Sequence, residues 1–76
     1  MPDVLLPRWG TSMREATLTR WYRRVGDQVH VGEPLADLVT DKVEVTLEVP
    51  ESGTVRAILV EEGATVPVGT LLAVIE

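Results

Sequence analysis

The sequence of 76 residues contains no cysteine, no phenylalanine, one histidine and one lysine. The absence of cysteine excludes disulfides, thiolate metal ligands and cysteine nucleophiles. The one histidine, His30, lies in a Val-His-Val-Gly turn, so a Ser-His-Asp triad would depend on a residue that suits an exposed turn. No His and carboxylate grouping has metal-ligand spacing, and no glycine-rich phosphate loop precedes a helix. We therefore expect neither a catalytic site nor a metal site.

Charge and hydrophobicity narrow the range of partners. Twelve acidic residues against seven basic ones give a formal net charge of -5, which would repel nucleic acid and anionic membranes. No apolar run approaches the roughly 20 residues of a membrane span, and the N-terminal segment lacks the pattern of a signal peptide. The hydrophobic content of 45% is globular, and the length suits one domain. We expect one soluble, intracellular domain over residues 1–76.

Short strands separated by turns dominate the pattern. β-branched residues are frequent, and Gly or Pro recurs every few residues, which favours strands over helices. The segment from Val43 to Val49 alternates strictly, which predicts that its Val and Leu side chains share one face. The predicted strands cover residues 3–6, 16–22, 28–29, 35–40, 43–49, 54–59, 65–66 and 71–75.

The two halves of the sequence resemble each other at a spacing of 37 residues. Six of the eleven positions from Gly26 to Ala36 are identical to their counterparts, where about one identity would be expected by chance. This repeat predicts an all-β fold, a flattened barrel or sandwich of two small antiparallel sheets with quasi-two-fold symmetry (a barrel-sandwich hybrid). Subtracting the repeat spacing of 37 from Lys42 gives Leu5, in the first predicted strand, and adding it gives a position past the C-terminus. The turn around Lys42 and the chain ends should therefore lie at opposite ends of the domain.

The only lysine lies in a predicted turn between two strands. Asp41 suits the first position of a type I turn, where its side chain accepts a backbone N–H. This arrangement leaves Lys42 at the tip of the hairpin, between Asp41 and Val43. Taken alone, the pattern also fits an ordinary exposed lysine.

Motifs along the whole chain resemble the lipoyl domains of 2-oxo acid dehydrogenase acyltransferases. They are Leu-Pro-Arg-Trp-Gly-Thr-Ser-Met at 6–13, Gly-Asp-x-Val-x-x-Gly-x-x-Leu-Ala at 26–36, Asp-Lys-Val at 41–43 and Glu-Val-Pro-x-Ser-Gly-Thr-Val at 48–55. The first of them is most similar to the pyruvate and acetoin dehydrogenase members. The resemblance places Lys42 in register with the attachment lysine of that family.

The resemblance implies that Lys42 carries lipoate as N6-lipoyllysine, with Asp41 and Val43 flanking the attachment site. Amide formation removes the lysine charge and leaves a neutral, flexible arm. The expected function is that of a carrier without an active site of its own, located in the cytoplasm or, in a eukaryote, the mitochondrial matrix. The implied partners are a thiamine-diphosphate-dependent decarboxylase, an acyltransferase core, dihydrolipoamide dehydrogenase and a lipoylating enzyme. Together the first three form a 2-oxo acid or acetoin dehydrogenase complex.

The resemblance also places the loop after the first strand close to the lysine hairpin. A loop held on a rigid sheet is a common location for specificity, so we expect partner enzymes to recognise this loop. The candidate recognition residues are Arg8, Trp9, Thr11, Ser12, Met13 and Arg14.

Two positions depart from the family pattern. Family members often have Glu where this chain has Val39, a difference that bears on recognition by the lipoylating enzyme. They usually have Gly where this chain has Ala16, although its repeat counterpart Gly53 is retained. The change to Ala indicates that the backbone there does not need a positive φ.

Two alternatives share the expected fold. A biotin carrier domain typically flanks its lysine with methionines, whereas Met1 and Met13 are far from Lys42 in this sequence. An unmodified structural module of a larger assembly is the second alternative. The mass of the protein expressed with both lipoate and biotin available distinguishes the three.

Overall fold

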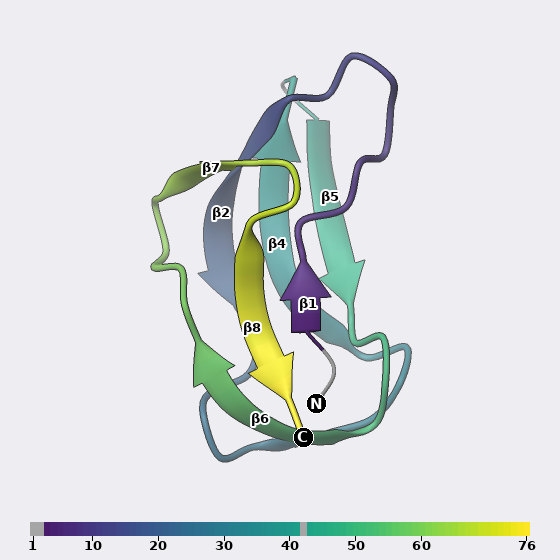
Figure 1. The fold of residues 1–76 in the computed structure, drawn as a ribbon, viewed down its shortest axis with the longest axis vertical. Coiled ribbons are helices and arrows are strands. Elements are labelled where there is room, and N and C mark those ends of the chain that lie inside the picture. Colours follow the sequence, from purple (N-terminus) through teal and green to yellow (C-terminus); the bar gives the residue numbers. More distant parts are fainter. Residues whose placement is uncertain (1–2, 42) are drawn as a thin grey trace.

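The computed structural model describes residues 3–41 and 43–76, and every regular element in these residues is a strand (Figure 1). The strands are β1 (Asp3–Leu5), β2 (Glu15–Trp21), β3 (Gln28–Val29), β4 (Pro34–Thr40), β5 (Val43–Glu48), β6 (Gly53–Ile58), β7 (Thr65–Pro67) and β8 (Leu71–Ile75). Each predicted strand is confirmed to within one residue at either end. The described segments contain no helix that could cross a membrane.

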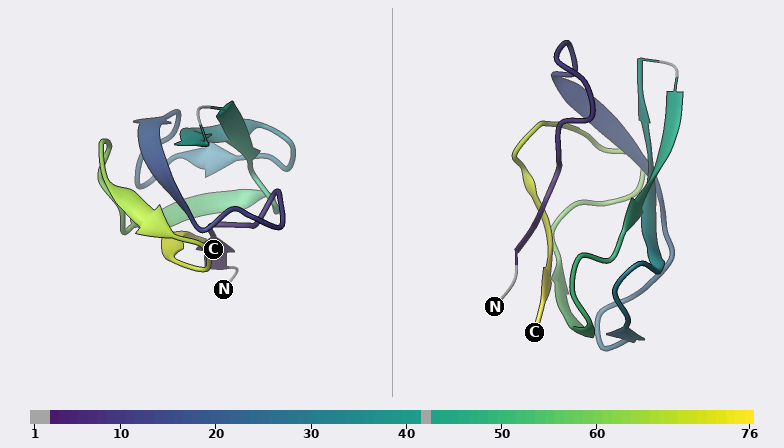
Figure 2. Two further views of the ribbon diagram at one scale, coloured as in Figure 1. Left: turned by 90° about the horizontal axis from the view of Figure 1, so that it is seen from above. Right: turned by 90° about the vertical axis from the view of Figure 1, so that its right-hand side faces the viewer.

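The strands form two four-stranded antiparallel sheets packed as two layers (Figure 2). One sheet has the order β1-β8-β6-β3 and the other has the order β5-β4-β2-β7. The all-β prediction is confirmed as a sandwich. The two sheets are those of the predicted flattened barrel or sandwich, and the hydrogen-bonded ladders of the described strands do not close into a barrel.

Apolar side chains from both sheets fill the space between the layers. Each of the larger ones contributes roughly 2 kcal/mol when it is withdrawn from water. The largest fully buried side chains are Leu6, Leu18, Leu35, Leu38, Leu72, Ile75, Val29, Val49 and Val55.

Burial along β5 decreases towards its hairpin with β4. Leu47 and Val49, the residue directly after the strand, are buried, Val45 is partly buried and Val43 is 57% exposed. The alternation predicted that β5 has one apolar face. Only the half of that face farther from the turn lies in the core. The hairpin therefore extends beyond the packed layers.

The predicted two-fold relation is present in the backbone hydrogen bonds. In each half, a turn that contains a glycine with φ above 90° bonds to a strand of the other half. Glycine adopts such angles without the strain that a Cβ would cause. The matching bonds are Gly26 N to Val55 O (2.8 Å) with Gly63 N to Leu18 O (2.7 Å), and Val55 N to Asp27 O with Leu18 N to Ala64 O (both 2.9 Å).

The first strand follows a different spacing. Val49 N donates to Glu33 O, while Leu6 N donates to Thr70 O, so Leu6 matches Val49 at a spacing of 43 instead of 37. The loop after β1 therefore carries a six-residue insertion relative to the one after β5. The sequence-based match of the hairpin lysine with Leu5 is wrong for this reason, although β1 still corresponds to β5.

The turn between β4 and β5 and the C-terminus lie at opposite ends of the long axis of the molecule (Figure 1). The domain measures 32 × 21 × 17 Å. Asp3, the first described residue, pairs with Val74 near the C-terminal end. The predicted separation of the turn from the chain ends is confirmed for the described residues on either side of the turn. Met1 and Lys42 lie outside the described residues.

Gly53 is needed for a close contact. An ideal Cβ at this position would lie 2.6 Å from the backbone oxygen of Glu76 and 2.9 Å from Cγ2 of Ile75. Its repeat counterpart, Ala16, is buried and carries a Cβ. Ala16 has no positive φ, as its residue type predicted, and neither has Gly53. The neighbouring chain thus approaches more closely in the second half than in the first.

We expect Gly53→Ala to lower the free energy of unfolding by about 1–3 kcal/mol, because the methyl group must displace backbone in a packed region. Gly10→Ala is the matched control, since a Cβ there meets nothing within 4 Å. Urea denaturation of both variants measures the effect. Equal midpoints for the two variants would contradict this account.

Candidate functional site

The hairpin between β4 and β5 has a two-residue loop. Thr40 and Val43 are the last paired residues, and Val39 pairs with Glu44 behind them. Only Asp41 and Lys42 separate the paired residues in the sequence. Two-residue loops are the tightest connection between antiparallel strands, and they fix the register of the ladder.

Asp41 adopts a left-handed backbone conformation with a φ of 49°. Because Thr40 pairs with Val43, Asp41 is the second of the four turn residues. The prediction of a type I turn with Asp41 at its first position is therefore wrong. A positive φ at the second position is typical of the primed turns that match the twist of a hairpin. Asp tolerates this conformation better than most residues with a Cβ.

The chain on both sides of Lys42 is accessible. Asp41 is exposed, and Val43 is 57% exposed. A protein that docks on the hairpin can therefore reach the residues that flank the lysine. Lys42 itself lies outside the described residues, and the sequence-based assignment of it as the attachment site stays a prediction.

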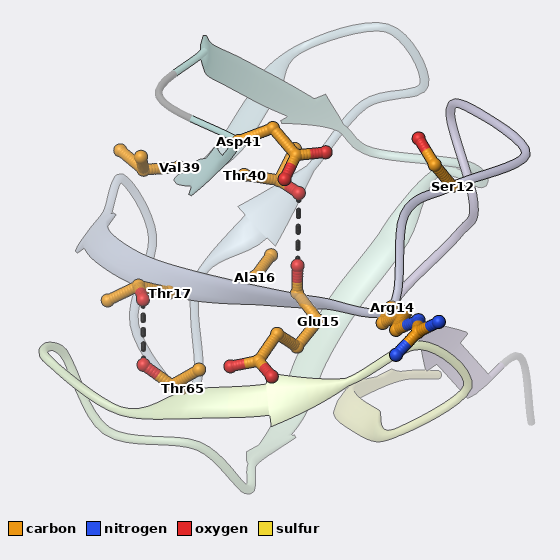
Figure 3. Close-up of a pocket in the computed structure, with 9 residues that line it drawn as sticks. All are labelled: Ser12, Arg14, Glu15, Ala16, Thr17, Val39, Thr40, Asp41 and Thr65. Carbon is orange, nitrogen blue, oxygen red and sulfur yellow. Dashed lines mark hydrogen bonds between the residues drawn. The ribbon is translucent and has the colours of Figure 1, made fainter.

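An open hollow of about 400 Å³ lies beside the hairpin (Figure 3). Two hydrogen bonds connect strands along it. The hydroxyl of Thr40 donates to the carbonyl oxygen of Glu15 at 3.0 Å, and the hydroxyls of Thr17 and Thr65 are 2.7 Å apart. The lining residues are Ser12, Arg14, Glu15, Ala16, Thr17, Val39, Thr40, Asp41 and Thr65.

The loop after β1 reaches the same hollow. Ser12 and Arg14 line it together with Asp41, so the expected proximity of loop and hairpin is confirmed for these residues (Figure 3). The side chains of Arg8, Thr11, Ser12 and Arg14 are exposed, and Trp9 is 43% exposed. Recognition of the loop by partner enzymes stays a prediction.

Met13 differs from the other candidate recognition residues, because its side chain is buried in the core. Its sulfur accepts a hydrogen bond from the backbone N–H of Trp9 at 3.4 Å, and its own N–H donates to Gly10 O at 3.1 Å. Met13 therefore anchors the loop to the sandwich, and any partner that docks on the loop meets its neighbours instead.

A buried carboxylate on β4 connects three strands behind the hairpin. Asp37 is 8% exposed, and both of its carboxylate oxygens are hydrogen-bonded. The hydroxyl of Tyr22 donates to Oδ2 at 2.7 Å, and the hydroxyl of Thr46 donates to Oδ1 at 2.8 Å. The guanidinium of Arg20 lies 4.7 Å from the centroid of the Tyr22 ring. This cluster ties β5 and the end of β2 to the centre of β4.

The hydrogen bonds of this cluster shift the pKa of the Asp37 carboxyl and the pKa of the Tyr22 hydroxyl in opposite directions. Donation by Tyr22, and then by Thr46, holds the pKa of Asp37 below its usual value despite the opposing effect of burial. The same bond raises the pKa of Tyr22 above its usual value. Sequence reasoning did not single out Asp37, although a carboxylate between the apolar residues of a strand was the available signal.

His30 lies apart from the hairpin and its hollow. Its side chain is 78% exposed, with Nδ1 3.5 Å from a carboxylate oxygen of Glu33. This agrees with the expectation of an exposed turn residue. Within residues 3–41 and 43–76, no group of His, Cys, Asp and Glu has the arrangement of a metal site.

A family model described as "Biotin-requiring enzyme", for biotin and lipoyl attachment, matches residues 2–75. The chain belongs to this biotin and lipoyl attachment family. The recognition of the family from sequence motifs is confirmed.

Relatives in the family are acyltransferase components. The dihydrolipoyllysine-residue acetyltransferase component of the pyruvate dehydrogenase complex from Mycobacterium tuberculosis is 46% identical over 70 residues, which are 92% of this chain. The corresponding component of the acetoin cleaving system from Pseudomonas putida is 39% identical over 72 residues, or 95% of the chain. The chain spans only 13% of the first relative and 20% of the second.

A solved structure shows the same fold. The lipoyl domain of the 2-oxoglutarate dehydrogenase complex from Azotobacter vinelandii matches with a TM-score of 0.83 and 29% sequence identity. The match covers 100% of this chain and 96% of that one. Within the attachment family, this chain thus has the lipoyl-domain fold.

The Asp37 cluster of this lipoyl domain gives a prediction for acid stability. A lowered folded pKa means that Asp37 stabilises the fold above its unfolded pKa of about 3.9 and that this contribution is lost as the pH falls below it. Tyr22→Phe removes the main hydrogen bond and keeps the ring beside Arg20. We expect the parent to be more stable than Tyr22→Phe near neutral pH, with the difference shrinking below about pH 4. Urea midpoints from pH 2 to 7 measure it, and a difference independent of pH would contradict the account.

Proposed function

We propose that residues 1–76 form one lipoyl carrier domain, with lipoate attached through an amide to the side-chain nitrogen of Lys42. This proposal rests on one observation above all: the two-residue β4–β5 turn contains the only lysine of the chain. Family membership and the lipoyl-domain fold support the same reading. The attached group supplies a dithiolane that takes up and releases acyl groups and electrons.

The residues beside Lys42 fit this attachment. Lipoylation requires a primary amine on a segment that can enter the active site of another enzyme. The exposed Asp41 and Val43 leave the turn accessible, and the paired strands on each side hold it in one register. Because the arm is long and flexible, the domain does not have to bury or orient the dithiolane.

In this proposal the domain brings the attached group to each partner enzyme, and the partner enzymes catalyse the reactions. Attachment to a folded domain raises the effective concentration of the reactive group at each enzyme that the domain visits. The turn and the C-terminus lie at opposite ends, so a tether at the C-terminus leaves the turn free (Figure 1). The chain has no active site of its own in this proposal.

The proposed partners follow from the relatives, whose names place them in pyruvate dehydrogenase and acetoin cleaving systems. They are a thiamine-diphosphate-dependent decarboxylase, an acyltransferase core, dihydrolipoamide dehydrogenase and a lipoylating enzyme. The complex would be a 2-oxo acid or acetoin dehydrogenase in the cytoplasm, or in the mitochondrial matrix of a eukaryote.

We expect Lys42→Arg to fold like the parent and to gain no lipoyl group. The change keeps the charge at an exposed turn, so the free energy of unfolding should differ by no more than about 0.5 kcal/mol. Arginine forms no amide because its guanidinium stays protonated and is a poor nucleophile. Co-expression with lipoyl and biotinyl ligases and both cofactors, followed by intact mass and peptide mapping, tests this.

The same experiment separates the proposed function from its alternatives. A biotinyl mass on the parent would make the domain a biotin carrier, and an unmodified parent would favour a structural module. A lipoylated Lys42→Arg variant would show that another amine is the attachment point. Each of these outcomes rejects the proposal.

A second prediction concerns the loop after β1. Replacing Thr11, Ser12 and Arg14 together with alanine should slow reductive acylation by the decarboxylase and leave lipoylation unchanged. All three residues are exposed, and Ser12 and Arg14 line the hollow beside the hairpin. A double replacement of the exposed Arg24 and Glu51, outside both loop and hairpin, is the control. If acylation of the triple variant keeps the parental rate, the loop is not part of the recognition surface.

A further inference from the structure

The side chain of Thr40 joins the β4–β5 turn to the strand that follows the loop after β1. Thr40 is the last paired residue of β4 before the turn, and it lies opposite Val43. Its hydroxyl donates to the carbonyl oxygen of Glu15, the first residue of β2, at 3.0 Å (Figure 3). Glu15 directly follows Arg14, one of the loop residues that line the hollow. One hydrogen bond thus connects the turn to the end of the loop.

This hydrogen bond lies beyond the paired residues of β2 and β4. The last partners of that ladder on the side of the turn are Thr17 and Val39. Thr40 is the next residue towards the turn, and a residue without a hydroxyl would lose the bond to Glu15. Burial adds little here, since Val43 opposite Thr40 is 57% exposed. The side chain of Thr40 therefore extends the contact between the two strands to the last residue before the turn.

The acceptor of this hydrogen bond is itself held by the rest of the domain. Glu15 pairs with Pro67 of β7. The carbonyl oxygen of Arg14 accepts a hydrogen bond from the backbone N–H of Val68 at 2.9 Å. The end of the loop is thus attached to β7 on one side, and the turn is bonded to this same point on the other.

On the basis of the proposed function, we propose that Thr40 is a positioning residue for reductive acylation, because its hydrogen bond to Glu15 sets the spacing between the turn and the loop after β1. A decarboxylase that contacts the loop while the attached group enters its active site requires this spacing. Without the bond, only a fraction of the turn conformations would present it, and the apparent affinity falls by that fraction. A lipoylating enzyme that docks on the turn alone does not depend on the spacing.

Thr40 takes no part in the bonds that form and break. In reductive acylation a carbon bound to the thiamine cofactor bonds to one sulfur of the dithiolane, and the S–S bond breaks. The carbon is oxidised to a thioester as its bond to the cofactor breaks, and the second sulfur takes up a proton to become a thiol. Two electrons pass from the carbon to the disulfide.

The test compares four forms of the lipoylated domain as substrates at varied concentration. Thr40→Val removes the hydroxyl and keeps the branched shape of the side chain, and Thr40→Ser keeps the hydroxyl. Thr19→Val is the matched control, because the hydroxyl of Thr19 also donates across β2 and β4, to the carbonyl oxygen of Asp37 at 3.2 Å. Thr19 is exposed and does not line the hollow. Urea denaturation shows that each form is folded.

The enzyme for the test is chosen from a panel of decarboxylases for pyruvate, 2-oxoglutarate, branched-chain 2-oxo acids and acetoin. The one that acylates the parent with the highest kcat/KM is used for all four forms. Lipoylation of the same forms by a purified lipoylating enzyme is measured in parallel. Backbone order parameters from NMR relaxation report the motion of Asp41 and Val43 without any enzyme.

We expect Thr40→Val to raise KM for acylation about three- to tenfold with little change in kcat, the range that the loss of one net hydrogen bond allows. Thr40→Ser and Thr19→Val should stay within about twofold of the parent, as other exposed substitutions do. Lipoylation should be equal in all forms. The order parameters of Asp41 and Val43 should fall in Thr40→Val and stay unchanged in Thr19→Val.

Several results would reject this role for Thr40. They are an unchanged KM or unchanged order parameters in Thr40→Val, an equal rise in KM for Thr19→Val, a Thr40→Ser form as poor as Thr40→Val, and an equal loss of lipoylation. A parent that is never lipoylated, or that no decarboxylase acylates, would instead reject the proposed function and this role with it. A parent that is acylated normally, with a KM insensitive to Thr40→Val, would leave that function standing and remove only the inference.

Discussion

The hydrogen bonds exchanged between the two halves hold the rest of the structure in place. Gly26 N donates to Val55 O, and Gly63 N donates to Leu18 O, so each half supplies a turn that completes a strand of the other. A half of this size could not bury its apolar face alone, and the exchange makes the two halves one cooperative unit. The exchange depends on glycine, since both turns need a φ above 90°.

The strands and the symmetry followed from the sequence because they depend on local patterns. Alternation, frequent β-branched residues and glycine turns are signals within a few neighbouring residues, and all of them favour short strands separated by turns. The repeat was visible for the same reason, since its identities are concentrated at turns and buried positions. The six-residue insertion after Leu6 was missed because the first strand is too short to carry a clear repeat of its own.

The features of the site that were missed depend on pairing between strands. The turn type around Asp41 follows from the pairing of Thr40 with Val43, and a register shifted by one residue would have changed it. The environment of Asp37 likewise needs the register of two ladders, which bring Tyr22 and Thr46 to its carboxylate. Sequence motifs singled out Lys42 and the loop after β1 as candidates. They carried no information on which residue lies opposite another on the neighbouring strand.

The two ends of β5 are stabilised by different means. Near Val49 the strand is held by burial between the layers, which is strong and requires no specific partner. Near Val43 the side chain is largely exposed, so burial contributes little there. The order of the exposed end must come from the ladder to β4, the two-residue turn and the hydrogen bond from Thr46 to Asp37. In the proposed function other enzymes must reach the turn, so the turn has to leave the core, and polar contacts maintain its shape without covering it.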